Sequence, residues 1–204
     1  KITGCEITQG YGLTETSPIV SVNKIKDPFN STIGLPLPST EISIRDKYGN
    51  ELGIEQEGEL CVRGPQVMSG YWNNIEETKN VFTDDGFFMT GDIARIDTNG
   101  FISIVDRKKD MIISSGFNVY PNEIEEYVSS HPGILECGVI GTKDKNRGES
   151  IILYAVRTDD NLNETDIIEF CKKGLTIYKI PKKVFFISEL PKNNVGKILR
   201  RKLR

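Results

Sequence analysis

The sequence predicts an α/β (α+β) protein in two parts, a β-rich part followed by a smaller part in which helices and strands are mixed. Apolar and polar residues alternate with period two between residues 41 and 106, as they do in half-buried strands. After residue 110 amphipathic helical patterns and short apolar runs follow one another. The charged stretch DRKKDM (106–111) separates the two patterns, which indicates a linker or a hinge.

Four strands are expected in the first part. EISIRD (41–46) and GELCVRG (58–64) each alternate apolar and polar residues, and DIARID and FISIVD flank Thr98-Asn99-Gly100. An Asn-Gly pair supplies the positive φ angles of a tight hairpin, and a further turn is expected at 47–50. These strands predict a small barrel or a meander.

The second part is expected to begin with a helix that opens at Pro121-Asn122 and stops at Pro132-Gly133. Strands follow at 136–141 and 151–157, and a last strand at 184–188. A second helix, with Asn163 and Thr165 as candidate caps, lies between them. The residues expected on the buried sides of the two helices are Ile124, Tyr127, Val128, Ile167, Ile168, Cys171 and Leu175.

Composition excludes several classes of protein. With 37% hydrophobic and 27% charged residues among 204, the chain has the composition of a globular protein, and its net charge of −3 argues against general attraction to nucleic acid. No apolar run approaches the ~18 residues of a membrane span, and no leader resembles a signal peptide. Its four scattered cysteines indicate reduced core thiols, and the single histidine, His131, is expected at the end of a helix. We therefore expect a cytoplasmic protein.

Four short motifs occur in order along the chain: QGYGLTE (9–15), TGD (90–92), DRKKDMIISSGFNVYPNEIE (106–125) and PKNNVGK (191–197). Alone, the first could be a surface loop and the last a solvated basic tail. Together they resemble the AMP-forming acyl-CoA synthetase superfamily, which includes firefly luciferase and the adenylation domains of peptide synthetases. Stretches such as GELCVRGPQVMSGYW and ELPKNNVGKILRRKLR are most similar to bacterial long-chain fatty acid–CoA ligases.

The resemblance implies how the chain is organised. Residues 1–107 would be the C-terminal part of the large AMP-binding domain, and residues 108–204 the small, mobile C-terminal domain beyond a hinge. The chain starts at Lys1 without methionine and enters a motif at once, which predicts a piece of a longer protein. Because the loop that holds the ATP phosphates and most of the fatty-acid tunnel are missing, the 204-residue chain alone is expected to be inactive.

The same resemblance assigns a nucleotide site. Tyr11 would stack on adenine, and Gly10 and Gly12 would allow close approach to the base. Thr14 would hydrogen-bond a phosphate oxygen, and Glu15 would help to hold Mg²⁺, which prefers carboxylate and phosphate oxygens.

Three further residues would complete this site. Asp92 would accept hydrogen bonds from both ribose hydroxyls, Ile104 would pack near the nucleotide, and Arg107 would contact ribose or phosphate.

In the small domain the resemblance points to catalysis and to coenzyme A. Lys197, on a loop made flexible by Gly196, would stabilise the charge that builds up when a carboxylate attacks the α-phosphate of ATP. With Thr14 and Glu15 it forms the expected catalytic set. Lys109 would be the hinge residue, and Ser115, Gly116 and Phe117 would line the path of pantetheine.

The expected activity is that of a long-chain fatty acid–CoA ligase with fatty acid, ATP and CoA as substrates, and peripheral contact with the inner face of the membrane is compatible with a lipid substrate. Two alternatives remain open. One is another adenylate-forming enzyme, which activates an aryl or amino acid. The other is a truncated module that binds lipid or nucleic acid through its basic tail.

Overall fold

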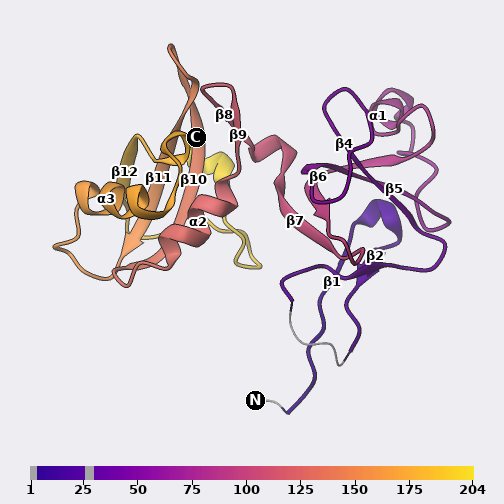
Figure 1. Cartoon of the computed structure of the whole chain (residues 1–204), viewed down its shortest axis with the longest axis horizontal. Coiled ribbons are helices and arrows are strands. Elements are labelled where there is room, and N and C mark those ends of the chain that lie inside the picture. Colours follow the sequence, from indigo (N-terminus) through magenta and orange to yellow (C-terminus); the bar gives the residue numbers. More distant parts are fainter. Residues whose placement is uncertain (1–3, 26–29) are drawn as a thin grey trace. The chain divides into compact units, whose positions relative to one another are not determined.

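The computed structural model describes residues 4–25 and 30–204, which belong to two compact units, residues 1–108 and 109–204. The first unit is dominated by antiparallel strands, and the second combines helices with a mixed sheet (Figure 1). The predicted α/β (α+β) class is therefore confirmed. The division between the units differs by one residue from the boundary expected between 107 and 108.

The first unit contains the predicted meander. Strands β4 (Glu41–Arg45), β5 (Gly58–Arg63), β6 (Phe88–Ile96) and β7 (Ile102–Arg107) pair antiparallel in that order. One face of this sheet packs on Val20 and Ile33 to form the core of the unit, while the strand β5 is buried on both faces. The buried members of this core are Val20, Ile33, Ile44, Leu60, Val62, Ala94 and Ile102.

The turn between β6 and β7 is wider than the Asn-Gly pair predicts. Gly100 has a φ of 85°, but Asn99 is not among the described residues with positive φ. The loop is instead organised by Asp97, whose Oδ1 accepts the backbone N–H groups of Asn99 and Phe101, both at 2.8 Å. An aspartate side chain that accepts backbone N–H groups of the residues after it is a common way to stabilise a turn.

A second, smaller sheet in this unit was not predicted. Strands β1 (Gly10–Gly12), β2 (Ile19–Val22) and β3 (Leu35–Pro36) form an antiparallel sheet in that order. Such short strands carry no readable alternation. Gly12 is required there because a Cβ at this position would lie 1.7 Å from the carbonyl oxygen of Pro18.

The short helix α1 (Ile75–Asn80) was also missed, because its six residues bury none of their side chains. Asn74 caps it, with Oδ1 accepting the N–H of Glu77 at 3.1 Å.

In the second unit one mixed sheet supports both helices. Strands β10 (Ile134–Asp144), β11 (Gly148–Arg157), β8 (Ile112–Ser114) and β9 (Phe117–Val119) are neighbours in that order, and β12 (Lys183–Phe186) pairs parallel with β11. The long β10–β11 hairpin contains the predicted strands 136–141 and 151–157. The short β8–β9 hairpin was not predicted.

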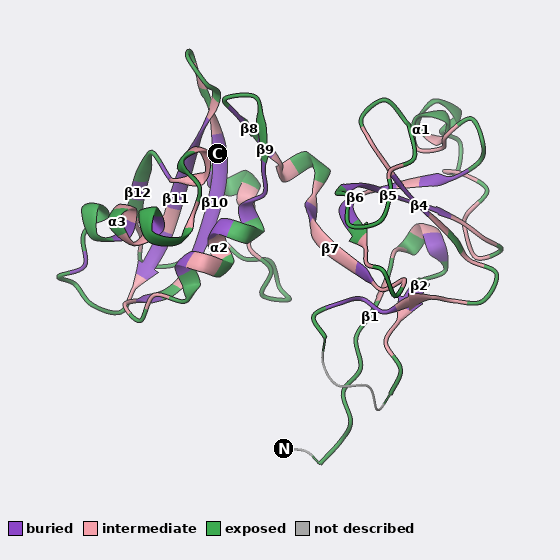
Figure 2. Ribbon diagram, in the orientation of Figure 1, coloured by how far each residue is buried: buried purple, intermediate pink, exposed green. Residues whose placement is uncertain are grey.

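The sheet of the second unit is covered on both faces. Helices α2 (Pro121–Ser129) and α3 (Glu164–Gly174) pack on Val139 and Leu153, while the neighbouring Ile140 contributes to a cluster on the other face (Figure 2). That second cluster includes Leu190 and Leu203 of the C-terminal tail. Because successive side chains of β10 point to opposite faces of the sheet, one face packs on the helices and the other on the C-terminal tail.

Both predicted helices are confirmed. Ile124, Val128, Ile167 and Cys171 are fully buried, and Tyr127, Ile168 and Leu175 are partly buried. Asn163 is the N-cap of α3, in a capping box with Asp166.

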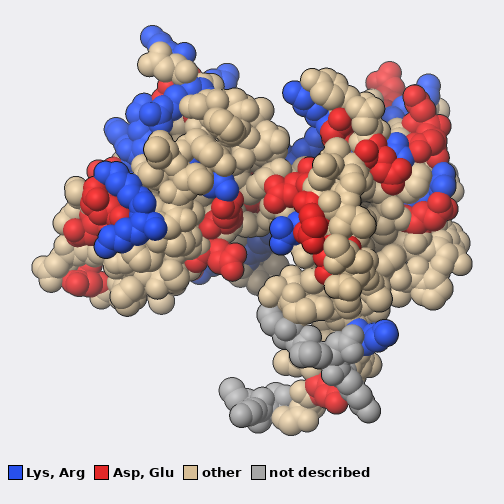
Figure 3. All heavy atoms as spheres, in the orientation of Figure 1, with Lys and Arg blue, Asp and Glu red and all other residues tan. Residues whose placement is uncertain are grey.

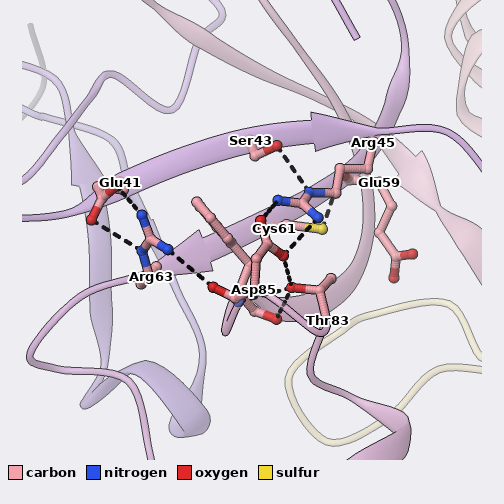
Figure 4. A network of polar contacts seen from close by, with 9 residues as sticks. Glu41, Ser43, Arg45, Glu59, Cys61, Arg63, Thr83 and Asp85 are labelled. Carbon is pink, nitrogen blue, oxygen red and sulfur yellow. Dashed lines mark hydrogen bonds and ion pairs between the residues drawn. The ribbon is translucent and has the colours of Figure 1, made fainter. Parts of the chain in front are cut away.

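A polar network secures the loop that leads into β6 (Figure 4). The guanidinium of Arg45 on β4 makes two hydrogen bonds to Asp85, at 2.9 and 2.6 Å. This bidentate pair holds the pKa of Asp85 well below its usual range, and Thr83 adds a further hydrogen bond. The guanidinium of Arg63 binds Glu41 and the carbonyl of Asp85. The loop is thereby fastened to β4 and β5.

The cysteines and the histidine are placed largely as expected. Cys61, Cys137 and Cys171 are buried free thiols, and burial raises the pKa of Cys61 to about 12. Cys5 is exposed, so the expectation of a core thiol is wrong at this position. His131 follows the end of α2 and packs edge-on against Phe170.

Side chains of both charges are interspersed on the visible surface of each unit (Figure 3). Within residues 4–25 and 30–204, no helix is long and apolar enough to cross a membrane.

Candidate active site

Three residues predicted to bind a nucleotide meet in the first unit. Asp92 on β6 lies opposite Arg107 on β7 in the strand register, and Tyr11 on β1 reaches the same carboxylate. The Tyr11 hydroxyl donates to Asp92 Oδ2 at 2.5 Å, and Arg107 Nε lies 2.7 Å from Asp92 Oδ1. Residues far apart in sequence therefore converge on one carboxylate.

Burial determines the electrostatics of this cluster. The Asp92 side chain is 4% exposed and that of Arg107 is 41% exposed, so the ion pair faces solvent from the arginine side. Burial raises the pKa of the Tyr11 hydroxyl above its ordinary value, and the hydrogen bond to Asp92 raises it further. Tyr11 is thus a neutral hydrogen-bond donor at all physiological pH values, and both Asp92 oxygens are oriented.

Glu15 has a partner that was not predicted. Tyr71 donates its hydroxyl to Glu15 Oε1 at 3.0 Å, and its own backbone N–H is held by Thr78 Oγ1 at 2.9 Å. The motif GELCVRGPQVMSGYW contains Tyr71, but no spacing rule links it to Glu15. The neighbouring Thr14 is exposed, and its hydroxyl makes no hydrogen bond within the part of the chain that is described.

A cavity of about 400 Å³ joins Glu15 to Arg107. Glu59 and Lys108 also line it and form an ion pair at 2.7 Å. Its remaining lining residues are Leu13, Tyr71, Asn80, Val81, Phe88, Met89, Thr90 and Gly91. The lining of the cavity thus contains both cations and carboxylates.

The carboxylate of Glu15 fits a Mg²⁺ ion. Among the described residues, no three His, Cys, Asp or Glu side chains gather as a metal site. Mg²⁺ is usually held by one or two carboxylates together with substrate phosphates, so a single carboxylate beside a cavity is a suitable donor set.

Gly10, Gly12 and Ile104 have local roles in the fold. Gly10 and Gly12 form β1 on either side of Tyr11. Ile104 is half-buried, pairs with Ala94 and packs on the core of the first unit.

In the second unit, Ser115 and Gly116 form the two-residue turn between β8 and β9, with φ angles of 54° and 84°. Phe117, which follows the turn, is 52% exposed and stacks on Tyr178 with ring centroids 4.4 Å apart. A Cβ on Gly116 would meet no atom within 4 Å, so the space beside the turn is open. Lys109 is exposed and lies in the 3-10 turn Lys108–Asp110.

Lys197 projects from a compact turn. Asn193 accepts the backbone N–H of Lys197 through Oδ1 at 2.8 Å, and its own N–H donates to the Lys197 carbonyl at 2.9 Å. Gly196 has a φ of 81°, which the turn requires. The Lys197 side chain is exposed and takes part in no ion pair between described residues.

Comparisons with known proteins show which family this chain is similar to. Residues 1–72 match the model of the AMP-binding enzymes, and residues 123–197 match that of the AMP-binding enzyme C-terminal domain. The long-chain-fatty-acid–CoA ligase of Escherichia coli O157:H7 is 52% identical over the whole of this chain, which spans 36% of that protein.

Two solved structures share the fold. ATP-bound MatB from Rhodopseudomonas palustris is 37% identical with a TM-score of 0.92, covering 97% of this chain and 40% of that one. The o-succinylbenzoate coenzyme A synthetase MenE from Bacillus subtilis, in complex with ATP and magnesium ion, is 35% identical with a TM-score of 0.86, covering 99% of this chain and 42% of that one. With matches to both family models and similarity along its whole length, the chain belongs to the AMP-binding enzymes.

Proposed function

We propose that the full-length protein is a long-chain fatty acid–CoA ligase. A carboxylate oxygen of the fatty acid attacks the α-phosphorus of ATP, and the bond to pyrophosphate breaks. The thiolate of CoA then attacks the acyl carbon of the adenylate, and AMP leaves with the bonding electron pair. Because the acid is a lipid, we also propose peripheral membrane contact, which co-sedimentation of the full-length protein with vesicles would test.

The nucleotide is bound by residues of the first unit. Adenine stacks on Tyr11 beside Gly10 and Gly12, with Ile104 packed nearby. The ribose hydroxyls donate to Asp92, and Arg107 contacts ribose or phosphate. The oriented Asp92 carboxylate and the half-exposed Arg107 guanidinium support these assignments.

The phosphates are held at the adjoining cavity. Thr14 donates its exposed hydroxyl to a phosphate oxygen, and Glu15, oriented by Tyr71, holds Mg²⁺. Mg²⁺ bound there would supply positive charge that offsets the negative charge of the phosphates.

Lys197 stabilises the transition state of adenylation. Its ammonium bridges the incoming carboxylate and the α-phosphate, where negative charge accumulates. Its exposure, and the absence of an ion pair among described residues, support this role.

Rotation about Lys109 then brings the β8–β9 turn to the acyl-adenylate for the second step. Ser115, Gly116 and Phe117 border the pantetheine path, which the open space beside Gly116 supports.

The observation that carries the proposal is the convergence of Tyr11 and Arg107 on the buried Asp92. This geometry suits a diol that replaces or joins the present hydrogen bonds, and ribose is such a diol.

The test is ATP–pyrophosphate exchange by the full-length gene product with short, medium and long fatty acids, an aryl acid and several amino acids. We expect exchange with long-chain acids, and a loss of about 10²–10³ in rate for Lys197→Ala, the usual effect of removing one group that stabilises developing charge. The 204-residue chain serves as a comparison and is expected to form no acyl-adenylate.

Stimulation by an aryl or amino acid alone would keep adenylate formation and contradict the fatty-acid assignment. An unchanged rate in Lys197→Ala would remove this residue from catalysis. No exchange with any acid would contradict the proposed function as a whole.

A further inference from the structure

The C-terminal tail, residues 191–204, is not a row of solvated cations. Lys192 pairs with Glu136, Arg200 with Glu125 and Asp110, and Arg204 also with Asp110. Three of its cations therefore meet carboxylates that lie far from the tail along the sequence. Lys197, by contrast, takes part in no ion pair between described residues, so paired cations stand on both sides of it along the tail.

Arg200 has the most extensive of these contacts. Its Nε and Nη2 donate to the two oxygens of Glu125 at 3.2 and 2.7 Å, and Nη2 also donates to Asn122 Oδ1 at 2.7 Å. Nη1 lies 3.7 Å from Asp110 Oδ2. The side chains of Arg200, Glu125 and Asp110 are only 13–14% exposed. A planar guanidinium in this bidentate, largely desolvated setting holds a fixed orientation.

The partners of Arg200 lie on helix α2 and in the segment after the proposed hinge. Glu125 lies on α2, and its Oε1 also accepts the backbone N–H of Val139 on β10 at 2.7 Å. Asp110 lies directly after Lys109, the proposed hinge residue, and binds Arg204 as well at 3.4 Å. The network thus joins the sheet, a helix and the segment beside the hinge to the tail.

Among the ion-paired residues of the tail, Arg200 is the nearest to Lys197 along the sequence. The Lys197 turn is closed by a bridge between Lys192 and Ile198 and by a hydrogen bond from Leu199 N–H to the Pro191 carbonyl at 2.7 Å. Arg200 follows Leu199 directly in the chain, with no loop between them. Any movement of the Arg200 backbone is therefore transmitted to the base of the turn.

We propose that Arg200 is a positioning residue for adenylation, which holds the Lys197 turn in fixed relation to the segment that follows the hinge. This inference rests on the proposed function of Lys197. Because the proposed function assigns Lys197 to the first half-reaction alone, Arg200 should affect adenylation and leave acyl transfer intact.

The test uses the full-length gene product with Arg200→Ala and Arg200→Lys, and Arg201→Ala as the matched control. Arg201 is exposed, is adjacent and has no ion pair in the described structure. We expect kcat for ATP–pyrophosphate exchange to fall at least about tenfold in both Arg200 variants, since small displacements of a catalytic group cost up to about 10²-fold. Transfer from supplied acyl-adenylate to CoA, and exchange in Arg201→Ala, should be unchanged.

A double-mutant cycle separates positioning from general destabilisation. If Arg200 acts through Lys197, adding Arg200→Ala to Lys197→Ala should cause no further loss of exchange. Should Arg200→Ala fail to fold, Arg200→Lys takes its place, because it keeps the charge and loses the bidentate fork.

Equal losses in both half-reactions, or an additive loss in the double variant, would overturn the inference and leave the proposed function standing. If the wild type catalyses exchange and both Arg200 variants keep the same rate, the inference is also overturned. Absence of exchange in the wild type would overturn the proposed function and this inference together.

Discussion

Asp92→Asn is the sharpest perturbation of the nucleotide site. The amide keeps the shape of the side chain, but one carboxylate oxygen becomes a donor and the charge is lost. In the structure the Tyr11 hydroxyl and Arg107 bind the two Asp92 oxygens. The Arg107 side chain is 41% exposed, so water can solvate its charge in the variant, and the fold should survive the exchange.

The expected magnitude follows from the hydrogen bonds to ribose. Hydrogen bonds to a charged group contribute about 1.5–3 kcal/mol each, and Asn retains one of two acceptor oxygens. Loss of one such bond weakens ATP binding about 10- to 100-fold, since each 1.4 kcal/mol is about a factor of ten.

Calorimetric titration of ATP and of its 2′- and 3′-deoxy analogues measures the effect. In the wild type each missing hydroxyl should weaken binding, and in Asp92→Asn this discrimination should diminish. Asp97→Asn is the matched control, because the Asp97 carboxylate also accepts two hydrogen bonds but lies in the β6–β7 loop and has no assigned role at the nucleotide. Full ribose discrimination in Asp92→Asn would refute the assignment of Asp92 to the ribose.

Two further predictions concern the supports of the site. Tyr71→Phe removes the hydrogen-bond donor to Glu15 Oε1. ATP binding that depends on Mg²⁺ should then need a higher Mg²⁺ concentration, while Mg²⁺-independent AMP binding is unchanged. The same Mg²⁺ dependence of ATP binding in the variant and the wild type would contradict this role. The Arg45 guanidinium depresses the pKa of Asp85, so the pair stabilises the fold above the unfolded pKa of about 3.9, and the stabilisation is lost as pH falls through the lower folded value. Asp85→Asn should therefore lower Tm at pH 7, with a difference that shrinks in acid; a constant difference would exclude this pair as its source.

Long periodic segments could be predicted from the sequence, because local pattern alone determines which face of an element is buried. The four strands of the meander and helices α2 and α3 are of this kind. Short elements could not be predicted. Strands β1 to β3 and the β8–β9 hairpin are too short to show an alternating pattern, and helix α1 buries none of its side chains.

The same distinction applies to the candidate site. The sequence by itself determined the family resemblance, and through it singled out Tyr11, Asp92, Arg107 and Lys197 as candidates. Only the tertiary structure decided which charges are neutralised, because ion pairs form between residues far apart in the chain. Arg200 and Lys197 look alike in a basic tail, yet one meets the carboxylates of Glu125 and Asp110 and the other extends into solvent.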